Sequence, residues 1–354
     1  MLNIGVIGCG AIGRDHIRRL TDIVPGCQVV ACADYFEEAA IKVAAQYEGM
    51  KAYKTGEELI AAPEVQAVVI TSSDPSHAGY VLEALKAGKY VFCEKPLAQN
   101  AEDCEKIIAA ETAHGKRLLQ VGFMRHYDRG YAEMKRIIDS GELGAPLMIH
   151  ACHRNVSQPD GFQTEMGVSN VAIHELDICR WLLGDEYKNG QVLKVRQSAC
   201  STKGYDNPQI VLLETQSGAR IDVEVQVADA YGYDIQCQVV CEKGTVNLPD
   251  PYAVVKRSNA TRSFPILTDW KDRFIEAYDI ELTHWVKTLE EKGEPDGPSA
   301  WDGYAACVAA DTLNRSRGTN QFLPIEMMDT PALYGDFGNA VARTHIGGVL
   351  HVGE

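Results

Sequence analysis

The chain has 354 residues, 45% of them hydrophobic and 23% charged, a composition typical of a globular protein with more than one domain. Its 34 Lys and Arg against 49 Asp and Glu give a net charge of −15, so neither nucleic acid nor an anionic membrane surface is an expected partner, because both are bound through basic side chains. The first residues show no basic segment followed by an apolar one, and no apolar run approaches the roughly 20 residues that span a bilayer, which predicts a cytoplasmic protein.

In the first third of the chain, short apolar runs alternate with longer segments of helical composition. The predicted strands are Leu2–Ile7, Val29–Ala33, Ala67–Thr71, Tyr90–Cys93 and Leu118–Val121, and the predicted helices are Ile12–Asp22, Phe36–Tyr47, Ser76–Ala87 and Asn100–His114. This alternation is typical of βαβ units around a buried parallel sheet. We therefore predict an α/β, doubly wound Rossmann domain that binds a dinucleotide over residues 1–122.

Beyond residue 122 the strands follow one another without helices between them. The predicted helices of this part are Tyr131–Ser140, Val171–Leu183, Phe274–Glu291 and Ala300–Arg315, and the predicted strands include Ile210–Thr215, Ala219–Val227, Ile235–Cys241 and Thr245–Leu248. Successive strands favour an antiparallel sheet, so residues 123–325 are predicted to form an α+β domain. Residues 326–354 have little periodicity and are treated as a C-terminal tail.

The segment from Gly8 to Gly13 fits the pattern GxGxxG between the first predicted strand and the first predicted helix. In this context the glycines permit a tight turn and a close approach of the backbone to a pyrophosphate, which the helix N-terminus attracts. Asp34 follows Gly13 by about 20 residues, where a carboxylate accepts hydrogen bonds from a ribose diol and repels a 2′-phosphate, so NAD is favoured over NADP. The expected cofactor contacts here are Gly8, Gly10, Ala11, Ile12, Gly13 and Asp34.

Polar residues also follow the next two strands of the predicted sheet. The loop from Thr71 to His77 suits the edge of a dinucleotide, but Asp74 or Ser76 capping the following helix is an equally good interpretation. Lys95 follows the strand that begins at Tyr90, and its ammonium is suited to stabilise an alkoxide as hydride leaves the carbon; a surface lysine in a turn is the alternative. Further candidate cofactor contacts are Thr71, Ser72, Ser73, His77, Glu94 and Lys95.

A predicted helix carries Asn170, His174 and Asp177, which share one face by their spacing. His174 is a candidate general base, and Asp177 is placed to steer its ring. A structural histidine is the alternative interpretation. The segment does not match HExxH, so it gives no reason to expect a metal, and the 11 cysteines contain no CxxC pair, which predicts free buried thiols.

Several motifs together resemble those of the Gfo/Idh/MocA oxidoreductases and, within them, of the bacterial inositol 2-dehydrogenases. They are Gly8–Gly13, Glu94–Pro96, Gln120–Arg125, His153–Asn155, Ile173–Asp177, Tyr231–Cys237, Leu267–Lys271 and Gly297–Gly303. The resemblance covers roughly residues 1–325. It implies a Rossmann domain followed by an open-faced sheet domain, and homotetramers packed through the sheets.

The resemblance also implies an activity and a set of site residues. It implies NAD-dependent oxidation of a secondary alcohol of a cyclic polyol, such as myo-inositol to its 2-keto product, with Lys95 and His174 at the reacting carbinol. It places the substrate ring against Lys95, Arg125, His153, Asn155, Asp177 and Tyr233. Oxidation of a related inositol, sugar or glucoside at C3 is an alternative.

Asn170 departs from the pattern that the resemblance implies. Inositol dehydrogenases usually carry an aspartate four residues before the catalytic histidine, and asparagine cannot supply its negative charge. Asn170 therefore belongs to the predicted catalytic group, and it leaves open a different substrate, a less assisted His174, or a catalytically impaired or regulatory NAD-binding homologue.

Overall fold

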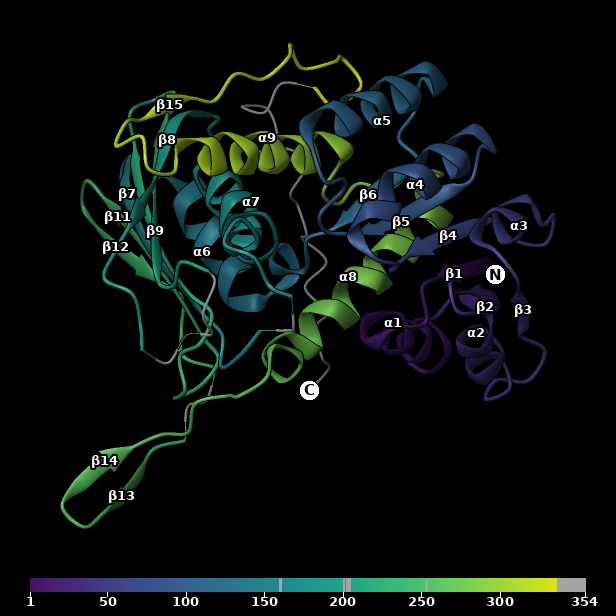
Figure 1. The fold of residues 1–354 in the computed structure, drawn as a ribbon, viewed down its shortest axis with the longest axis horizontal. Helices are drawn as coiled ribbons and strands as arrows, with labels where there is room; N and C mark the ends of the chain where they lie inside the picture. The colour runs from purple at the N-terminus through teal and green to yellow at the C-terminus, as the bar shows by residue number, and fades with distance from the viewer. Residues whose placement is uncertain (159–160, 200, 202–204, 252–253, 336–354) are drawn as a thin grey trace.

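The computed structural model describes residues 1–158, 161–199, 201, 205–251 and 254–335. These form two large β-sheets with helices around and between them, and a small two-stranded sheet (Figure 1). The first sheet is parallel throughout, with strand order β3-β2-β1-β4-β5-β6. Its strands are β1 (Leu2–Ile7), β2 (Cys27–Ala33), β3 (Lys51–Tyr53), β4 (Ala67–Ile70), β5 (Tyr90–Glu94) and β6 (Leu119–Gly122). The accompanying helices are α1 (Ala11–Asp22), α2 (Glu37–Ala44), α3 (Gly56–Ala61), α4 (His77–Lys86) and α5 (Ala101–His114), with a 3₁₀ turn η1 (Asp74–Ser76). The predicted doubly wound domain is confirmed, and its strand order reverses between β1 and β4, where such sheets bind ligands.

The second sheet is mixed but mainly antiparallel, as predicted. In the described part of the chain its strand order is β12-β11-β7-β10-β9-β8-β15, and β7 and β10 run parallel. The strands are β7 (Pro146–Arg154), β8 (Tyr187–Lys194), β9 (Gln209–Thr215), β10 (Arg220–Gln226), β11 (Asp234–Cys241), β12 (Gly244–Asn247) and β15 (Leu323–Pro324). Helices α6 (Arg129–Ser140), α7 (Ile173–Leu183) and α9 (Ala300–Ser316) lie on one side of this sheet. Along the chain, the short segment η2 (Met124–Tyr127) precedes α6, and η3 (Gly167–Ala172) precedes α7.

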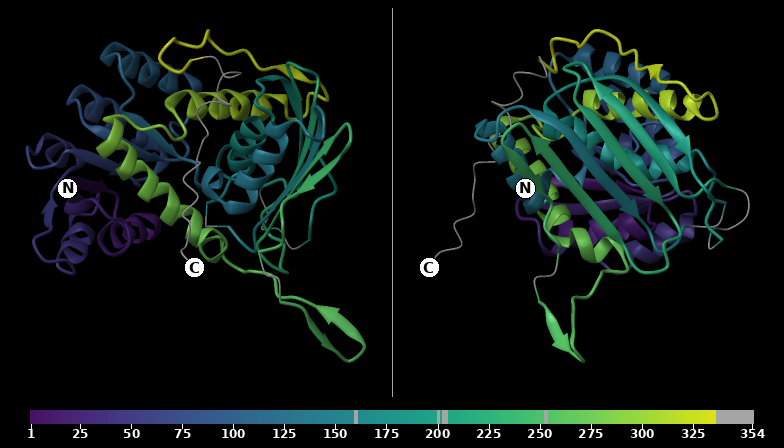
Figure 2. Two further views of the ribbon diagram at one scale, coloured as in Figure 1. Left: turned by 180° about the vertical axis from the view of Figure 1, so that it is seen from behind. Right: turned by 90° about the vertical axis from the view of Figure 1, so that its left-hand side faces the viewer.

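No helix of the described residues covers the other face of the second sheet (Figure 2, right panel). The burial of β9 explains this: Val211 and Leu213 are buried toward the helices, whereas Ile210 and Leu212 on the opposite face are partly exposed. Alternation of this kind is the pattern of a sheet with one packed and one accessible face. The expected open-faced sheet is therefore present.

Helix α8 (Trp270–Lys292) comes late in the chain but packs against the first sheet (Figure 1). Its residues Leu282 to Leu289 share one apolar core with Ile4 of β1 and Phe92 of β5. The ring of Trp285 has no exposed surface, and its centroid lies 5.5 Å from that of Phe92. A helix of the second half of the chain therefore completes the apolar core of the first half. The domain boundaries at residues 122 and 325 stay a prediction.

The described part of the predicted tail packs on the body of the molecule. Tyr334 donates a hydrogen bond of 2.7 Å from its hydroxyl to Glu111 of α5, and the backbone N–H of Met328 donates to the hydroxyl of Tyr304 on α9. A hairpin of β13 (Lys256–Ser258) and β14 (Thr261–Ser263) projects from the body (Figures 1 and 2). Residues 336–354 lie outside the described residues. Among the described helices, none is both long enough and apolar enough to cross a membrane.

Candidate active site

A cavity of about 670 Å³ lies where the carboxyl ends of the first sheet meet the second half of the chain. The nucleotide-binding half contributes Ile12, Thr71, Ser72, Asp74, His77, Glu94 and Lys95 to its wall. The second half contributes, among others, Met124, His153, Asn155, Asn170, His174, Tyr233 and Tyr278. The structure thus brings together the predicted cofactor loop, lysine and histidine at one cavity.

The glycine loop connects β1 to α1 and leaves space beside the helix N-terminus. Gly8 has a φ of +103°, which side-chain-bearing residues rarely adopt, and a Cβ on Gly13 would lie 1.9 Å from the carbonyl oxygen of Gly8. A Cβ on Gly10 would meet no atom within 4 Å, so the open side of the loop is at Gly10. Gly10 caps α1 without a side chain, so the first amides of the helix remain available to an anion.

Asp34 lies at the end of β2, beside this loop. Its carboxylate accepts hydrogen bonds from the backbone N–H of Cys9 (2.6 Å) and of Phe36 (2.9 Å), which fix its position. The glycine cradle, the uncapped helix and this carboxylate fit a dinucleotide with a free ribose diol.

The loop that follows β4 is tied to both the glycine loop and the lysine. Thr71 donates from its hydroxyl to the carbonyl oxygen of Gly8 at 2.8 Å. The ring nitrogens of His77 lie 2.7 Å from the carbonyl oxygen of Pro96 and 3.0 Å from that of Ser72. His77 therefore links the loop that follows β4 to the turn that carries Lys95.

The alternative interpretation of this loop as a helix cap is wrong. Neither η1 nor α4 has a hydrogen bond from a capping side chain. The hydroxyl of Ser76 instead contacts Ser72 Oγ at 2.7 Å and the carbonyl oxygen of Ser73 at 2.7 Å. Asp74 accepts a hydrogen bond from the side-chain amide of Asn170, in the other half of the molecule.

Lys95 directly follows β5 and extends along the cavity wall. Its Nζ donates to the backbone carbonyl of Asn170 at 3.4 Å. The preceding residue, Glu94, holds the turn in place, since it pairs with His16 of α1 at 2.8 Å and accepts from the backbone N–H of Lys95 at 3.3 Å. Burial lowers the pKa of Lys95, and the negative charges of Glu94 and Asp74 oppose that effect.

His174 lies in the first turn of α7, directly after η3. Burial, and then the positive charges of Lys95 and Arg125, hold its pKa well below the usual value of 6.5. Its Nδ1 has no hydrogen-bond partner among the described residues. A neutral imidazole beside an ammonium group is an arrangement suited to accept a proton from a hydroxyl.

A cluster of buried polar side chains, Arg125, His153 and Glu175, lies behind Lys95 and His174. Arg125 pairs with Glu175, and His153 Nδ1 lies 2.9 Å from the second carboxylate oxygen of Glu175 and 3.2 Å from Arg125. Of the predicted substrate contacts, His153, Asn155 and Tyr233 line the cavity, whereas Arg125 lies in the cluster behind His153. Glu175 was not expected from the sequence, although it is adjacent to His174 and is the carboxylate that balances Arg125.

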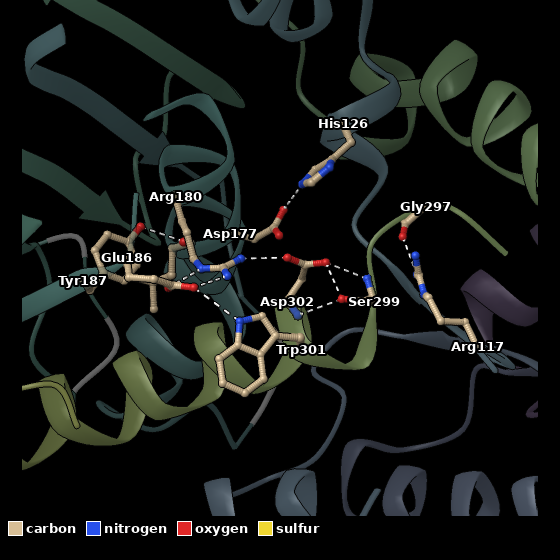
Figure 3. Close-up of polar contacts among 11 residues, drawn as sticks. Arg117, His126, Asp177, Arg180, Glu186, Tyr187, Gly297, Ser299, Trp301 and Asp302 are labelled. Carbon is tan, nitrogen blue, oxygen red and sulfur yellow. Dashed lines mark hydrogen bonds and ion pairs between the residues drawn. The ribbon is translucent and has the colours of Figure 1, made fainter. Parts of the chain in front are cut away.

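Asp177 does not steer His174, contrary to the prediction. Its carboxylate lies 2.8 Å from Nε2 of His126 on η2 (Figure 3). The ring of His126 stacks on Trp181 with a centroid separation of 4.5 Å. Three residues along an α-helix turn a side chain about 60° away from the direction of the first, which takes Asp177 to a different neighbour.

An ion-pair network anchors the helix that carries His174 (Figure 3). Arg180 of α7 bonds to Glu186 at 2.6 and 2.7 Å and to Asp302 of α9 at 2.7 Å. The hydroxyl of Tyr187 donates to the carbonyl oxygen of Leu176 at 2.7 Å. These contacts fix α7 against β8 and α9, so that the imidazole is presented from a rigid support.

The side chain of Asn170 faces Asp74 rather than His174. Asn170 belongs to η3, which has π-helical geometry, so the α-helical spacing that places it on the face of His174 does not hold. Its Nδ2 donates to Asp74, and its Oδ1 accepts from the hydroxyl of Ser169 at 3.0 Å. No local pattern predicts this partner, which lies 96 residues away in the sequence.

In the described residues, no three or more His, Cys, Asp or Glu side chains are grouped as ligands. The cysteines of the described residues are free and buried, as predicted.

Two family models match the chain and leave a short gap between them. Residues 2–123 match the oxidoreductase family model described as an NAD-binding Rossmann fold, and residues 135–327 match that of its C-terminal α/β domain. The chain is 52% identical over 335 residues to inositol 2-dehydrogenase of Burkholderia cenocepacia, covering 94% of this chain and 99% of the relative. It is 53% identical over the same length to inositol 2-dehydrogenase of Ralstonia nicotianae, with the same coverage.

A solved structure has the same arrangement of both domains. Myo-inositol dehydrogenase from Lactobacillus casei, in complex with NAD(H) and myo-inositol, superposes with a TM-score of 0.91 at 38% identity, covering 94% of this chain and 99% of that one. The two domain matches and the relatives aligned over nearly their whole length lead to one conclusion: the chain belongs to the Gfo/Idh/MocA oxidoreductase family.

Proposed function

We propose that this protein is an NAD-dependent inositol 2-dehydrogenase, which oxidises one secondary alcohol of myo-inositol to a ketone. The observation that carries the proposal is that Lys95 and a neutral His174 line one cavity, which Ile12 of the glycine loop also lines. The relatives at 52–53% identity are named for this activity.

The cofactor site is suited to NAD in its polar contacts and in its shape. We expect the amides of the Gly8–Gly13 loop to hold the pyrophosphate and Asp34 to accept the ribose hydroxyls. The loop from Thr71 to His77, with Glu94, would line the remainder of the dinucleotide site. When bound, NAD supplies the acceptor for the hydride that leaves the substrate carbon.

The side chains of the chain itself move the proton and orient the ring. His174 takes the proton of the reacting hydroxyl, and the ammonium of Lys95 stabilises the alkoxide that develops. The remaining hydroxyls meet His153, Asn155 and Tyr233 in the wall, with the phenol of Tyr233 kept protonated because burial raises its pKa to about 12. Arg125 and Asp177 contribute through His153 and His126, the histidines that they contact.

A substrate panel tests the proposal directly. Purified enzyme with NAD is assayed for NADH formation on myo-inositol, other inositols, hexoses and glucosides, with a Lys95→Met variant as the inactive control. We expect turnover on myo-inositol and none in the variant. Turnover confined to glucosides would replace the proposal by oxidation at sugar C3, and no turnover on any member of the panel would favour a regulatory NAD-binding protein.

We further propose that the enzyme is a cytoplasmic homo-oligomer, a tetramer, which associates through the uncovered face of the second sheet. The support is that Ile210, Leu212 and Met148 lie on this face and are not buried, and the strand register places each beside a charged residue, Glu224, Asp222 and Arg220 respectively. Light scattering is expected to give a multiple of the 38.8 kDa chain mass, and Leu212→Arg is expected to lower it. A monomeric wild type would contradict the proposal.

A further inference from the structure

The contact between Asp74 and Asn170 joins the two halves of the molecule at the edge of the active-site cavity. Asp74 lies on η1, between β4 and α4 of the nucleotide-binding half, and Asn170 lies on η3, four residues before His174. Both side chains line the cavity. The carboxylate of Asp74 accepts from Nδ2 of Asn170, although the two residues are 96 positions apart.

Lys95 lies against the same pair. Its Nζ donates to the backbone carbonyl of Asn170 at 3.4 Å. Asn170 therefore contacts Asp74 through its side chain and Lys95 through its main chain. The negative charge of Asp74 also acts directly on Lys95, because it favours the protonated ammonium. Asp74 therefore influences the lysine through two routes, one geometric and one electrostatic.

We propose that Asp74 is a positioning residue for the oxidation: through the amide of Asn170 it fixes the carbonyl that holds the Lys95 ammonium, and it supplies the negative charge that the neutral Asn170 does not carry. This inference deepens the proposed function and rests on it. It also gives Asn170 a role, since an amide donates to Asp74 whereas a carboxylate at the same position would repel it.

The charges around Lys95 decide what removal of Asp74 does to the pH profile. Glu94 on β5 and Glu175 on α7 favour the ammonium together with Asp74, whereas Arg125 on η2 disfavours it. His174 on α7 stays neutral because burial and these cations lower its pKa. Without the charge of Asp74 the pKa of Lys95 falls, so the alkaline limb of the activity profile moves to lower pH.

An exchange of the two side chains isolates the role of charge. Asp74→Asn, Asn170→Asp and the double variant are compared with wild type for kcat, KM and pH profile on NAD and myo-inositol. Asp74→Asn leaves two amides in contact, and Asn170→Asp leaves two carboxylates in contact. Each single variant is therefore expected to lose about 10- to 100-fold in kcat. The double variant restores one donor and one carboxylate, and we expect it to regain most of the rate and the wild-type alkaline limb.

A matched control separates charge from hydrogen bonding. Ser169→Ala removes the other hydrogen bond of the Asn170 side chain without altering a charge. It is expected to leave the alkaline limb where it is in wild type. A shift as large as that of Asp74→Asn would mean that any loosening of Asn170 suffices, and would overturn the role of the charge.

A measurement independent of turnover distinguishes failure of this inference from failure of the proposed function. The pH dependence of acetic anhydride labelling at Lys95, followed by mass spectrometry of its peptide, gives the pKa of Lys95 in each folded variant. We expect it to fall in Asp74→Asn and to recover in the double variant, whichever polyol is the substrate. An unchanged labelling profile in Asp74→Asn, or a double variant no better than the poorer single variant, would overturn the proposal.

Discussion

Lys95 and His174 illustrate how burial assigns different tasks to two bases in one cavity. Burial penalises the charged form of both, and it lowers both pKa values. The lysine keeps carboxylates nearby, whereas the charges that act on the histidine are positive. The same environment thus leaves one group protonated to stabilise an alkoxide and the other neutral to accept its proton.

The pH dependence of kcat/KM follows from this division. His174 must be neutral, and its pKa is below 6.5, so activity rises with pH along a limb that lies below 6.5. Lys95 must be protonated, and its pKa is below 10.5, so activity falls along a limb below 10.5. Initial rates on NAD and inositol from pH 5 to 10.5 would check both. An acid limb centred above 6.5 would contradict a buried neutral His174.

Cofactor preference is also determined at the level of one residue. Asp34→Ser removes the carboxylate that would accept hydrogen bonds from the ribose hydroxyls and repel a 2′-phosphate. The ratio of kcat/KM for NAD to that for NADP is therefore expected to fall roughly 10- to 100-fold, which corresponds to the loss of one or two charge-assisted hydrogen bonds. Asp34→Asn is the companion variant, because it keeps an acceptor for the N–H of Cys9 but no charge. An unchanged ratio in both would remove Asp34 from this role.

At the scale of elements, the sequence predicts regular segments with strong local signals and fails at those without them. Helix α9 begins at the predicted residue because Ser299 and Asp302 form a capping box. Strand β7, central to the second sheet, was missed because its sequence, PLMIHACHR, alternates poorly between apolar and polar. The short β3 and α3, of three and six residues, are below the length at which periodicity is detectable.

The same limit applies to the site. Local patterns make the glycine loop, Lys95 and His174 candidates, and the structure places Lys95 and His174 at one cavity, but their predicted roles depend on the family resemblance. The contacts of Asn170 and Asp177 could not, since one depends on a π-helical segment and the other on a histidine from η2. Spacing along a helix predicts which side chains share a face, but the partner on the facing element is decided by tertiary structure.

Two glycines of the cofactor loop are expected to behave differently when each is replaced by alanine. Gly13→Ala places a Cβ against the carbonyl of Gly8 and should lower the free energy of unfolding by about 1–3 kcal/mol. The Cβ of Gly10→Ala meets no atom of the described residues within 4 Å, so this variant should keep the wild-type melting temperature. It should weaken NADH binding, since the Cβ occupies the space through which the pyrophosphate approaches the loop. Thermal melts and NADH fluorescence titrations would check this. Full NADH affinity in Gly10→Ala would contradict the proposed position of the pyrophosphate.

At the scale of the whole molecule, helix α8 joins the two halves into one unit. Its apolar side chains complete the core on one face of the first sheet, and Arg19 of α1 donates to the carbonyl oxygen of Ile275 at 2.8 Å and pairs with Asp279. The cavity likewise takes walls from both halves. We therefore expect the nucleotide-binding half and the second half to unfold together.

Trp285→Ala tests this coupling. The ring is fully buried against Phe92, so its removal should lower the free energy of unfolding by about 3–5 kcal/mol and weaken NADH binding, although Trp285 lies outside the sequence of the first half. Lys287→Ala, at an exposed position of the same helix, is the control and should leave both quantities unchanged. Calorimetry would reveal the coupling as a single transition; a second transition that Trp285→Ala leaves in place would contradict it.

The position of α8 also has a consequence for synthesis of the chain on the ribosome. Domains usually fold as they emerge, the N-terminal one first. Here the first sheet is complete once Gly122 has been made, but the helix that covers one of its faces arrives only with Leu282 and the residues after it. At about 5–20 residues per second, that interval lasts roughly 8–30 s, during which Ile4 and Phe92 lack their cover. The sheet that is translated before α8 thus reaches its final form only after α8 has been made, and nascent chains should depend on chaperones through that interval.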